Sequence, residues 1–562
     1  MAMHIHGSFS EGMASMDAHL FQAQRLGVDV VWWTDHDFRA AAFGYRTAVG
    51  LESESEPEGP WDWTWTPVVS GDVEGSHQFV ETPHSPDEAG GALQLTARSG
   101  ASPGWSSYAL QAVSANLLYS TSYYDTTLSL DVLPQALSAD AQVVVEVVSS
   151  FRAASHGRPA GQYRMQYRLS SGGTGRHLEA GGLLGVVSLP AGPADTWQRI
   201  DMDLRADHEA LWPDTVSFDA SLVQLLIGVR ARRGAAAAAV ADRLRFARTR
   251  TGGSDALAAL RTAMRANSAR YPDVTQYAAS ELSLVKHLNA FGGDRLLPQY
   301  DMPYPVKDTD DAKQRAAVDF LHEHGAVVSI NHPLSDSRGA SALATRLIMT
   351  NGNGADVIEI GTKADLATLE QVYDIAARNA VFLTANGASD DHDGDDWLST
   401  TPPDARWLTS VWSASRGKTD LCDALRAGRA WFYDPLRWRG EFDLLVDGLT
   451  SMGGVHFTSR RKVAVEVTAT RLGGGSTLEL VVGRCDSAGV GQLSAVNVRT
   501  SVPAADVVGG RWATGVQVAD GIYVRAMVRS RRGVVVGFSN PVWVLPPAQA
   551  SRVTVPAARL RS

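Results

Sequence analysis

The stretch HIHGSFSEG, residues 4–12, decides which fold and chemistry the 562-residue chain is expected to have. It places His4 and His6 two positions apart and an acidic residue, Glu11, shortly after them. Because residues i and i+2 of a strand face the same way, one strand end can direct both imidazoles toward one point. Two neutral imidazoles held together favour a metal ion, provided that other segments supply the missing ligands.

Later segments do carry side chains of the ligand type. At least five apolar runs that are typical of buried strands end in or near a His, Asp or Glu. Helical spacing separates several of them, as in residues 16–26 and 311–325. In α/β barrels the chemistry lies at the carboxyl ends of the strands, so we expect these side chains to converge. The strand-end residues are Asp35, His36, Glu281, His287, His332, Glu359, Asp390 and His392.

Composition excludes several classes of partner. The net charge is -10 with no long basic run, which argues against nucleic acid as a partner. No apolar run reaches the ~18 residues of a membrane helix. Two distant cysteines, Cys422 and Cys485, fit neither a disulfide scaffold nor a cysteine zinc site, although a single bridge is left open. There is no P-loop and no G-x-S-x-G sequence, so triphosphate cleavage and serine hydrolysis have no support.

The compartment and the oligomeric state are left open. The chain as given carries no signal peptide. Few residues precede His4, whereas a strand usually needs ~5, so we expect the natural protein to begin upstream. An upstream start is compatible with export, and the chain as given is otherwise expected to be cytoplasmic.

Two regions alternate with period two between Gly, Ser and Pro turns, which predicts antiparallel sandwiches. Residues 60–253 are expected to form an inserted β-sandwich whose texture is similar to a carbohydrate-binding module. Residues 437–562 are expected to form an Ig-like sandwich. The tryptophans of the insert could form a sugar-stacking face, but core packing is the favoured role for most of them. They are Trp61, Trp63, Trp65, Trp105 and Trp197.

The order H-x-H, T-D-H, E…H, H-P and G-x-S-D-x-H resembles the PHP (polymerase and histidinol phosphatase) superfamily of metallohydrolases. The resemblance covers about residues 4–40 and 278–430, and residues 281–292 look like the branch of carbamate-hydrolase-like proteins. It implies a fold of the α/β class, a distorted TIM-like (β/α) barrel. The barrel would be built from residues 1–59 and 254–436 and interrupted by the insert.

Carried over by position, the resemblance implies two or three divalent metal ions, with Zn, Mn or Fe suited to mixed imidazole and carboxylate ligands. Three ligand groups are implied, with Glu281 bridging the first two. The groups are His4, His6, Glu281 and Asp390; then Glu281, His287 and His332; then Glu11, His36 and His392. His36, His392 and Asp35 are the candidate catalytic groups, as proton donors or in support of them. Lys286, Lys363 and Arg406 are candidate anion contacts.

Three functions follow as expectations. The first is a phosphoesterase that uses a hydroxide held between two metal ions on a phosphate mono- or diester of a small or glycan-linked molecule. The second keeps the metal centre but hydrolyses a carbamate, amide or ester, since fold does not decide substrate. The third is a glycan- or surface-binding protein whose barrel is vestigial.

Overall fold

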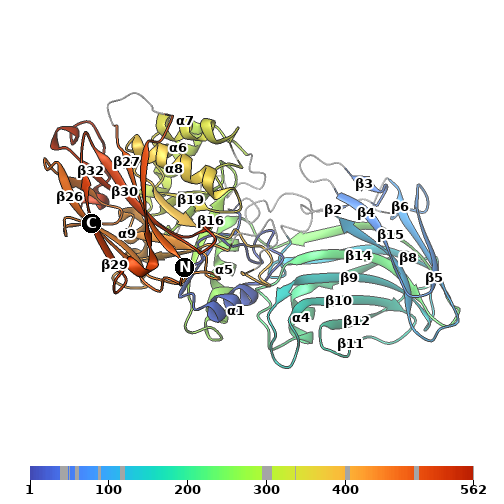
Figure 1. The fold of residues 1–562 in the computed structure, drawn as a ribbon. Helices are drawn as coiled ribbons and strands as arrows, with labels where there is room; N and C mark the ends of the chain where they lie inside the picture. Colours follow the sequence, from blue (N-terminus) through green and yellow to red (C-terminus); the bar gives the residue numbers. More distant parts are fainter. Residues whose placement is uncertain are drawn as a thin grey trace.

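The computed structural model describes residues 1–37, 48–49, 51–56, 63–86, 90–113, 121–293, 307–335, 337–398, 406–486 and 493–560. Strands dominate the described chain and form five sheets. The ribbon has two lobes, one holding both termini and the other holding the strands from β3 to β15 (Figure 1). Among the described residues, no helix combines the length and the apolar character needed to cross a bilayer.

The sheet that carries the candidate site has the order β1-β16-β17-β18-β19-β20. Four of its short strands, β17 to β20, and β1 are buried along their whole length, and the polar side chains inside them, such as Asn289, Ser329 and Glu359, are buried as well. β17 runs antiparallel to both of its neighbours, and the other pairs are parallel. The bounds are β1 (Val30–Trp33), β16 (Thr275–Leu282), β17 (Leu288–Phe291), β18 (Val327–Ile330), β19 (Val357–Gly361) and β20 (Thr384–Gly387).

Helices cover this sheet, and the sequence explains their ends. The Ser15 side chain accepts from the Ala18 amide at the start of α1, and Gly27 ends the helix with a φ of 67°. Asp310 and Asp365 cap α6 and α8 in the same way. The helices are α1 (Met16–Leu26), α5 (Gly253–Ser268), α6 (Asp311–Glu323), α7 (Ala340–Met349), α8 (Leu366–Arg378) and α9 (Lys418–Ala427).

The predicted α/β fold class with a distorted TIM-like barrel is wrong. A (β/α) barrel needs eight parallel strands, each followed by a helix. Here β16 and β17 form an antiparallel pair joined by residues 283–287, and in the described chain β1 and β20 do not pair with each other. Residues 2–6 lie between these two edges and form backbone hydrogen bonds with both, from the Ala2 amide to the Val30 carbonyl and from the His6 amide to the Asp391 carbonyl, but they make isolated bridges and no strand. The sheet is therefore open.

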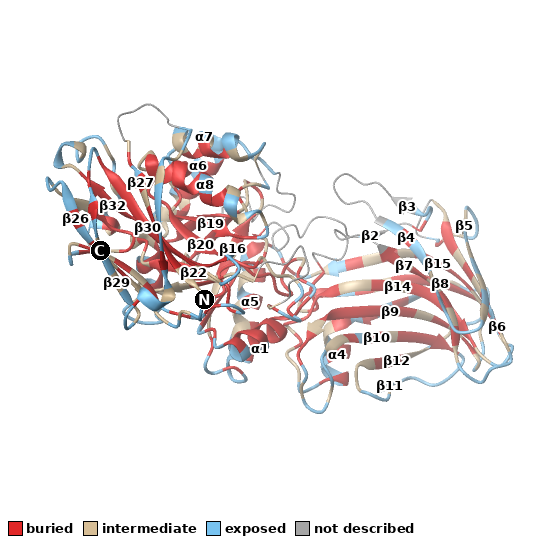
Figure 2. Cartoon of the chain, in the orientation of Figure 1, coloured by how far each residue is buried: buried red, intermediate tan, exposed pale blue. Residues whose placement is uncertain are grey.

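The second lobe is a sandwich of two sheets. One has the order β11-β12-β10-β9-β14-β7-β4-β3, and the other β13-β8-β15-β6-β5 with β2 beside β15. Apolar side chains such as Val145, Ile227 and Leu130 fill the space between them, and buried residues follow β9, β10 and β14 in Figure 2. Two of the strands, β2 and β3, precede residue 60, so this sandwich begins before the expected boundary of the insert.

The strands of this lobe are β2 (Ala48–Val49), β3 (Ser55–Glu56), β4 (Trp63–Ser70), β5 (Val73–Val80), β6 (Ala92–Ser99), β7 (Ser106–Val113), β8 (Thr126–Ala136), β9 (Ala141–Arg152), β10 (Gly161–Ser170), β11 (Gly175–Leu178), β12 (Leu184–Pro190), β13 (Gln198–Asp203), β14 (Leu222–Ala231) and β15 (Ala236–Arg248). One helix, α4 (Leu204–Leu211), follows β13.

The C-terminal region is also a two-sheet structure. Its larger sheet follows β21-β22-β31-β30-β27-β28, with β32 beside β30 and β25 beside β32, and its smaller sheet follows β24-β23-β26-β29. Val465 and Val524 belong to the apolar core that joins the two sheets. Both cysteines, Cys422 and Cys485, are buried and free.

The strands of this region are β21 (Leu408–Val411), β22 (Ala430–Tyr433), β23 (Phe442–Val446), β24 (Thr450–Ser451), β25 (Val455–Phe457), β26 (Lys462–Ala469), β27 (Thr477–Arg484), β28 (Asn497–Pro503), β29 (Arg511–Gln517), β30 (Ile522–Arg529), β31 (Val535–Ser539) and β32 (Val542–Leu545).

Asp219 joins the sandwich lobe to the start of α1. Its buried carboxylate accepts from the Met16 amide at 2.7 Å, the Asp17 amide at 2.9 Å and the Ser8 hydroxyl at 2.8 Å. These amides belong to the first turn of the helix, which favours a negative charge. The residue therefore fixes the loop of residues 7–12 from the other lobe.

Candidate metal centre

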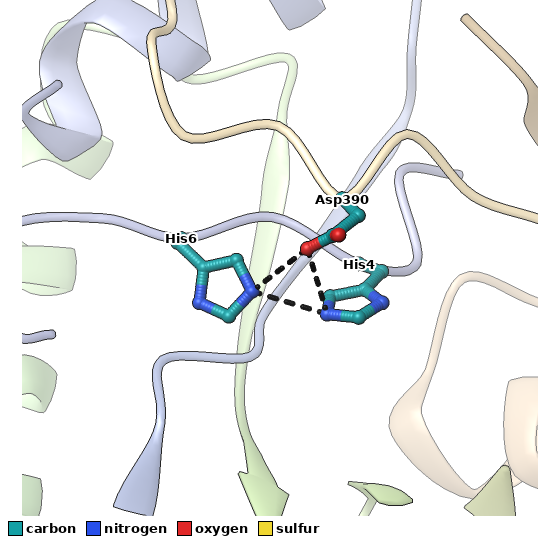
Figure 3. A group of neighbouring side chains, drawn as sticks. All are labelled: His4, His6 and Asp390. Carbon is teal, nitrogen blue, oxygen red and sulfur yellow. Dashed lines mark hydrogen bonds and ion pairs between the residues drawn. The ribbon is translucent and has the colours of Figure 1, made fainter. Parts of the chain in front are cut away.

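His4 and His6 lie on the segment between the edges of the open sheet. Ile5, the residue between them, is buried in an apolar core and bonds through its backbone to Thr34. Both imidazoles therefore point to the opposite side, where they meet Asp390 (Figure 3). His4 Nε2 lies 3.1 Å from His6 Nε2, and Asp390 Oδ1 lies 3.1 Å from His6 Nε2 and 3.3 Å from His4 Nε2.

Glu281 lies at the centre of the cluster, near the carboxyl end of β16, and is 1 % exposed. Its Oε2 atom lies 3.2 Å from His4 Nε2, 3.3 Å from His6 Nε2 and 3.1 Å from His36 Nδ1. Its Oε1 atom faces the other way, 3.0 Å from His287 Nδ1 and 3.2 Å from His332 Nε2. One carboxylate thus connects two groups of imidazoles.

Glu11 organises the third group. Its Oε1 atom lies 2.7 Å from His36 Nε2, 3.3 Å from His392 Nε2 and 3.5 Å from His6 Nδ1. Glu11 and His392 are held near each other by the backbone, since the Met13 amide donates to the His392 carbonyl at 2.8 Å. All nine candidate ligands are therefore brought together in one cluster.

The donor atoms have the spacing expected of ligands that share ions. Two nitrogens that each lie about 2.1 Å from one ion, at a tetrahedral angle, are about 3.4 Å apart. Four sets of three ligand atoms lie within 4.8 Å of one another, and His6 belongs to three of these sets. His36 Nδ1 lies 3.1 Å from Glu281 Oε2 without the angle of a hydrogen bond. The donor set therefore fits transition-metal ions.

Charge in the cluster is balanced internally. Burial by itself lowers the pKa of His4, but Glu281, Glu359 and Asp390 outweigh burial and raise that pKa well above its usual value. Burial would raise the pKa of Glu281, but the imidazoles of His36 and His4 hold it well below the usual range. The carboxylates are therefore ionised and available to cations.

Neighbouring groups orient the ligands. Glu359 Oε1 lies 2.8 Å from His4 Nδ1, and its Oε2 accepts from the His332 amide at 2.7 Å. His392 Nδ1 lies 2.9 Å from the Asp390 carbonyl oxygen, which only an N–H can satisfy. Contacts of this kind leave the Nε2 lone pairs of His4 and His392 directed into the cluster.

Two of the ligands also have unusual backbone conformations. The φ angle is 23° at His332 and 52° at Asp390, in the left-handed region that residues other than glycine rarely adopt. Each such residue costs of order 1–3 kcal/mol and persists where its surroundings hold it, most often at functional sites. The backbone thus bends to present these two side chains.

The other predicted site residues divide into two kinds. Lys363 is at the centre, with Nζ 3.4 Å from Asp390 Oδ2. Lys286 instead pairs with Asp311, and Arg406 pairs with Asp434 at 2.9 Å. Asp35 accepts from the Gly7 amide and the Ser10 hydroxyl, so it supports the loop of residues 7–10 and lies outside the ligand sets. Burial raises the pKa of Asp35 to about 6.

Two buried residues at the centre were not predicted from the sequence. Asn331 donates from Nδ2 to Glu281 Oε1 at 2.9 Å, and its position between a strand end and His332 was the available signal. His19, on α1, bonds through Nε2 to the His6 carbonyl at 3.0 Å. Its place on α1 gave no indication of this contact.

The tryptophans that could have formed a sugar-stacking face differ in burial. Trp65 is buried in the sandwich core, whereas Trp105 and Trp197 are half-buried. Trp61 and the side chain of Trp63 lie outside the described residues. The packing role expected for most of these tryptophans therefore fits Trp65.

Comparison with known families gives no assignment. No family model matches the chain, and no curated protein matches it. The predicted membership in the PHP superfamily is therefore wrong, because no family model supports it and the sheet is not a closed barrel. The zinc- or manganese-dependent phosphoesterase of that type loses its support with it.

The solved structures that are similar to the chain are β-sandwich proteins. An endoglucanase of family GH12 from Trichoderma harzianum is 11% identical over 34% of this chain and 100% of its own, with a TM-score of 0.23. A family 12 xyloglucanase from Bacillus licheniformis is 7% identical over 36% and 99%, with a TM-score of 0.22. A carbohydrate-binding module of the β-sandwich superfamily is 9% identical over 33% and 56%, with a TM-score of 0.19. Likeness at this level carries no argument about activity.

Proposed function

We propose that the protein is a hydrolase that depends on divalent transition-metal ions held by the nine-residue cluster. One observation carries the proposal: six imidazoles and three carboxylates meet with donor atoms 2.7–3.5 Å apart at one end of the open sheet. An isolated pair of histidines, whether buried or on the surface, needs no such set of ligands around it. Ion pairs that only stabilise a fold do not gather six imidazoles.

The chain's own residues define how such a centre would work. Bound ions of this kind lower the pKa of a water molecule and polarise the bond that it attacks. Glu281 holds two ligand groups at a fixed separation, because its two oxygens face different imidazoles. With an ion bound, His4 and His392 would keep the proton on Nδ1, which bonds to Glu359 and to the Asp390 carbonyl, and would present Nε2 to the ion. These contacts favour ligand roles for both histidines, and we propose that His36 delivers a proton only when the group of Glu11, His36 and His392 holds no ion.

Lys363 supplies the charge that complements the substrate. Its side chain is 28% exposed and its ammonium group lies beside Asp390, so it can contact an oxygen that becomes negative as the bond breaks. We therefore propose an ester or carbamate substrate with an anionic oxygen next to the cleaved bond. Lys286 and Arg406 have no part in this proposal because they pair elsewhere.

The test is a substrate panel on the full chain, first stripped with a chelator and then reconstituted separately with manganese, zinc or iron. The panel contains a nitrophenyl phosphate, a bis-nitrophenyl phosphate, a nitrophenyl ester and a nitrophenyl carbamate. We expect turnover of at least one compound by a reconstituted protein and none by the stripped protein. Equal turnover with and without metal, or none at all, would contradict the proposal.

A further inference from the structure

A cluster of arginines lies on the sandwich lobe, away from the metal centre. It is on the face of the larger sandwich sheet that points away from the core, which we call the outer face. Alternate residues of β9 and β14, such as Val143 and Val229, fill the core. The residues between them point outward, and the outer face includes Trp105, Ser107, Gln142, Arg168, Arg230 and Arg232.

Arg230 is the central member of this cluster. It is 8% exposed, and its Nε donates to the neutral Gln142 Oε1 at 2.8 Å. Its guanidinium lies 4.0 Å from the centre of the Trp105 ring. In the described part of the chain, no carboxylate lies within ion-pair distance of Arg230, whereas its neighbours have one each.

The neighbours leave an excess of positive charge. Arg168 pairs with Glu179 at 3.0 Å, and Arg232 pairs with Asp140 at 2.5 Å while lying 4.7 Å from the Trp105 ring. Three guanidiniums thus face two carboxylates. Burial first, and then the charges of Arg168 and Arg232, lower the pKa of Arg230 to about 9. A bound anion would relieve this repulsion.

The surrounding side chains suit a sugar. Ser107, Gln111, Gln142 and Gln166 are half-buried on the same face and carry hydroxyl or amide groups. Such groups hydrogen-bond hydroxyls, while a guanidinium recognises a carboxylate with two parallel hydrogen bonds. Both features are fixed on rigid strands, which lowers the cost of ordering them.

We propose that the outer face binds an acidic oligosaccharide, with Arg230 taking the carboxylate of a uronate unit. The site lies on a different lobe from the metal cluster and does not depend on the hydrolase proposal.

The same face argues against a glycosidase site. Hydrolysis of a glycosidic bond normally uses a pair of carboxyl groups, about 5–5.5 Å apart in retaining enzymes. On the described outward positions of β4, β7, β9, β10 and β14, Glu146 is the one carboxylate, and it is bonded to Arg164 at 2.8 Å. Glu179 and Asp140 lie beyond these strands and are each paired with an arginine. The outer face is therefore suited to binding rather than cleavage.

Calorimetric titration of the full chain tests the site with three probes: a galacturonate oligomer, a sulfated oligosaccharide and a neutral cello-oligosaccharide. We expect the galacturonate oligomer to bind with an affinity that falls as salt rises. Arg230→Gln should weaken the affinity for the galacturonate oligomer by about ten-fold or more, and Arg230→Lys should retain part of that affinity. Arg164→Gln is the matched control, because the Arg164 side chain lies on the same face and is 50% exposed. This substitution should change the affinity by less than about two-fold.

The outcomes are decisive either way. An equal affinity of wild type and Arg230→Gln for the galacturonate oligomer, with both proteins folded by circular dichroism, would overturn the proposal. So would tighter binding of the neutral probe, or no binding of any probe. Binding of the sulfated probe alone, lost in Arg230→Gln, would keep the anion site but overturn the choice of a uronate.

Discussion

Lys363 is the cationic side chain that lies at the metal centre, beside Asp390. Lys363→Met should lower kcat/KM by about ten-fold or more, because the contact to the oxygen that becomes negative is lost. Metal content should not change, since Lys363 is not a ligand. Steady-state kinetics with metal analysis check this. Lys286→Met is the matched control, and an equal effect of the two substitutions would contradict the role of Lys363.

The sequence predicts the candidate ligands better than it predicts the residues that contact them. The nine candidate ligands converge because each follows an apolar strand or the N-terminal segment, and strand ends meet at one edge of a sheet. Lys286 and Arg406 were misplaced because a cation's partner depends on packing between distant segments. Asp219, which contacts Ser8 across more than 200 residues, left no local signal at all.

Asp219 couples the sandwich to the site through α1. Asp219→Ala would remove the acceptor of two first-turn amides and of the Ser8 hydroxyl. We expect a loss of about 1–3 kcal/mol in the free energy of unfolding, as for other buried donors left unsatisfied. The ion group that contains Glu11 should lose occupancy first, because its loop is released.

Thermal unfolding and metal analysis of the Asp219→Ala protein check this coupling. Asp201, an exposed residue on β13 of the same lobe, provides the control substitution Asp201→Ala. Unchanged stability together with an unchanged metal content would show that the sandwich does not support the site.

The open sheet shows where prediction at the level of elements fails. Buried apolar runs identify strands but not the direction in which they pair. Residues 283–287 connect the antiparallel strands β16 and β17, although they contain no glycine or proline to mark a change of chain direction. Alternating segments were easier to interpret, because period-two patterning with turns implies antiparallel neighbours.

A buried ion network joins the site-bearing region to the C-terminal sheets. Arg525, which is fully buried, bonds to Asp374 at 2.7 Å and to Glu370 at 2.6 Å, both on α8. Burial would raise the pKa of Glu370, but Arg525 and Arg499 outweigh it and lower that pKa. The network therefore fixes α8 against β30.

This network predicts how stability depends on pH. The pKa of Glu370 is depressed in the folded state. Its contribution to the free energy of unfolding is therefore full above its unfolded pKa of about 4.3, and it is lost as pH falls through the pKa of the folded state. Urea unfolding at pH 7 and at lower pH should show that acidification lowers the free energy of unfolding less for Glu370→Gln than for wild type. Arg525→Met should cost about 3–5 kcal/mol at pH 7, because the buried carboxylate of Asp374 loses its arginine partner and Glu370 is left with Arg499. Identical acid sensitivity in wild type and Glu370→Gln would contradict this assignment.

The arrangement of the whole molecule was the least predictable feature. Composition and alternation indicated two strand-rich regions, but the contacts that fix the sandwich to α1 join residues far apart in the chain. The position of β2 and β3 in the sandwich, before residue 60, likewise depends on pairing with β15 and β4.

The metal content of the purified full chain, measured by elemental mass spectrometry after exhaustive dialysis, tests most directly whether the nine-residue cluster binds metal. We expect about two or three divalent transition-metal ions per chain. Glu281→Gln should lose at least one of them, while Glu323→Gln, an exposed substitution on α6, should lose none. A wild-type protein without bound metal after reconstitution would contradict the assignment of the cluster as a metal centre. So would a Glu281→Gln protein that binds as many ions as wild type.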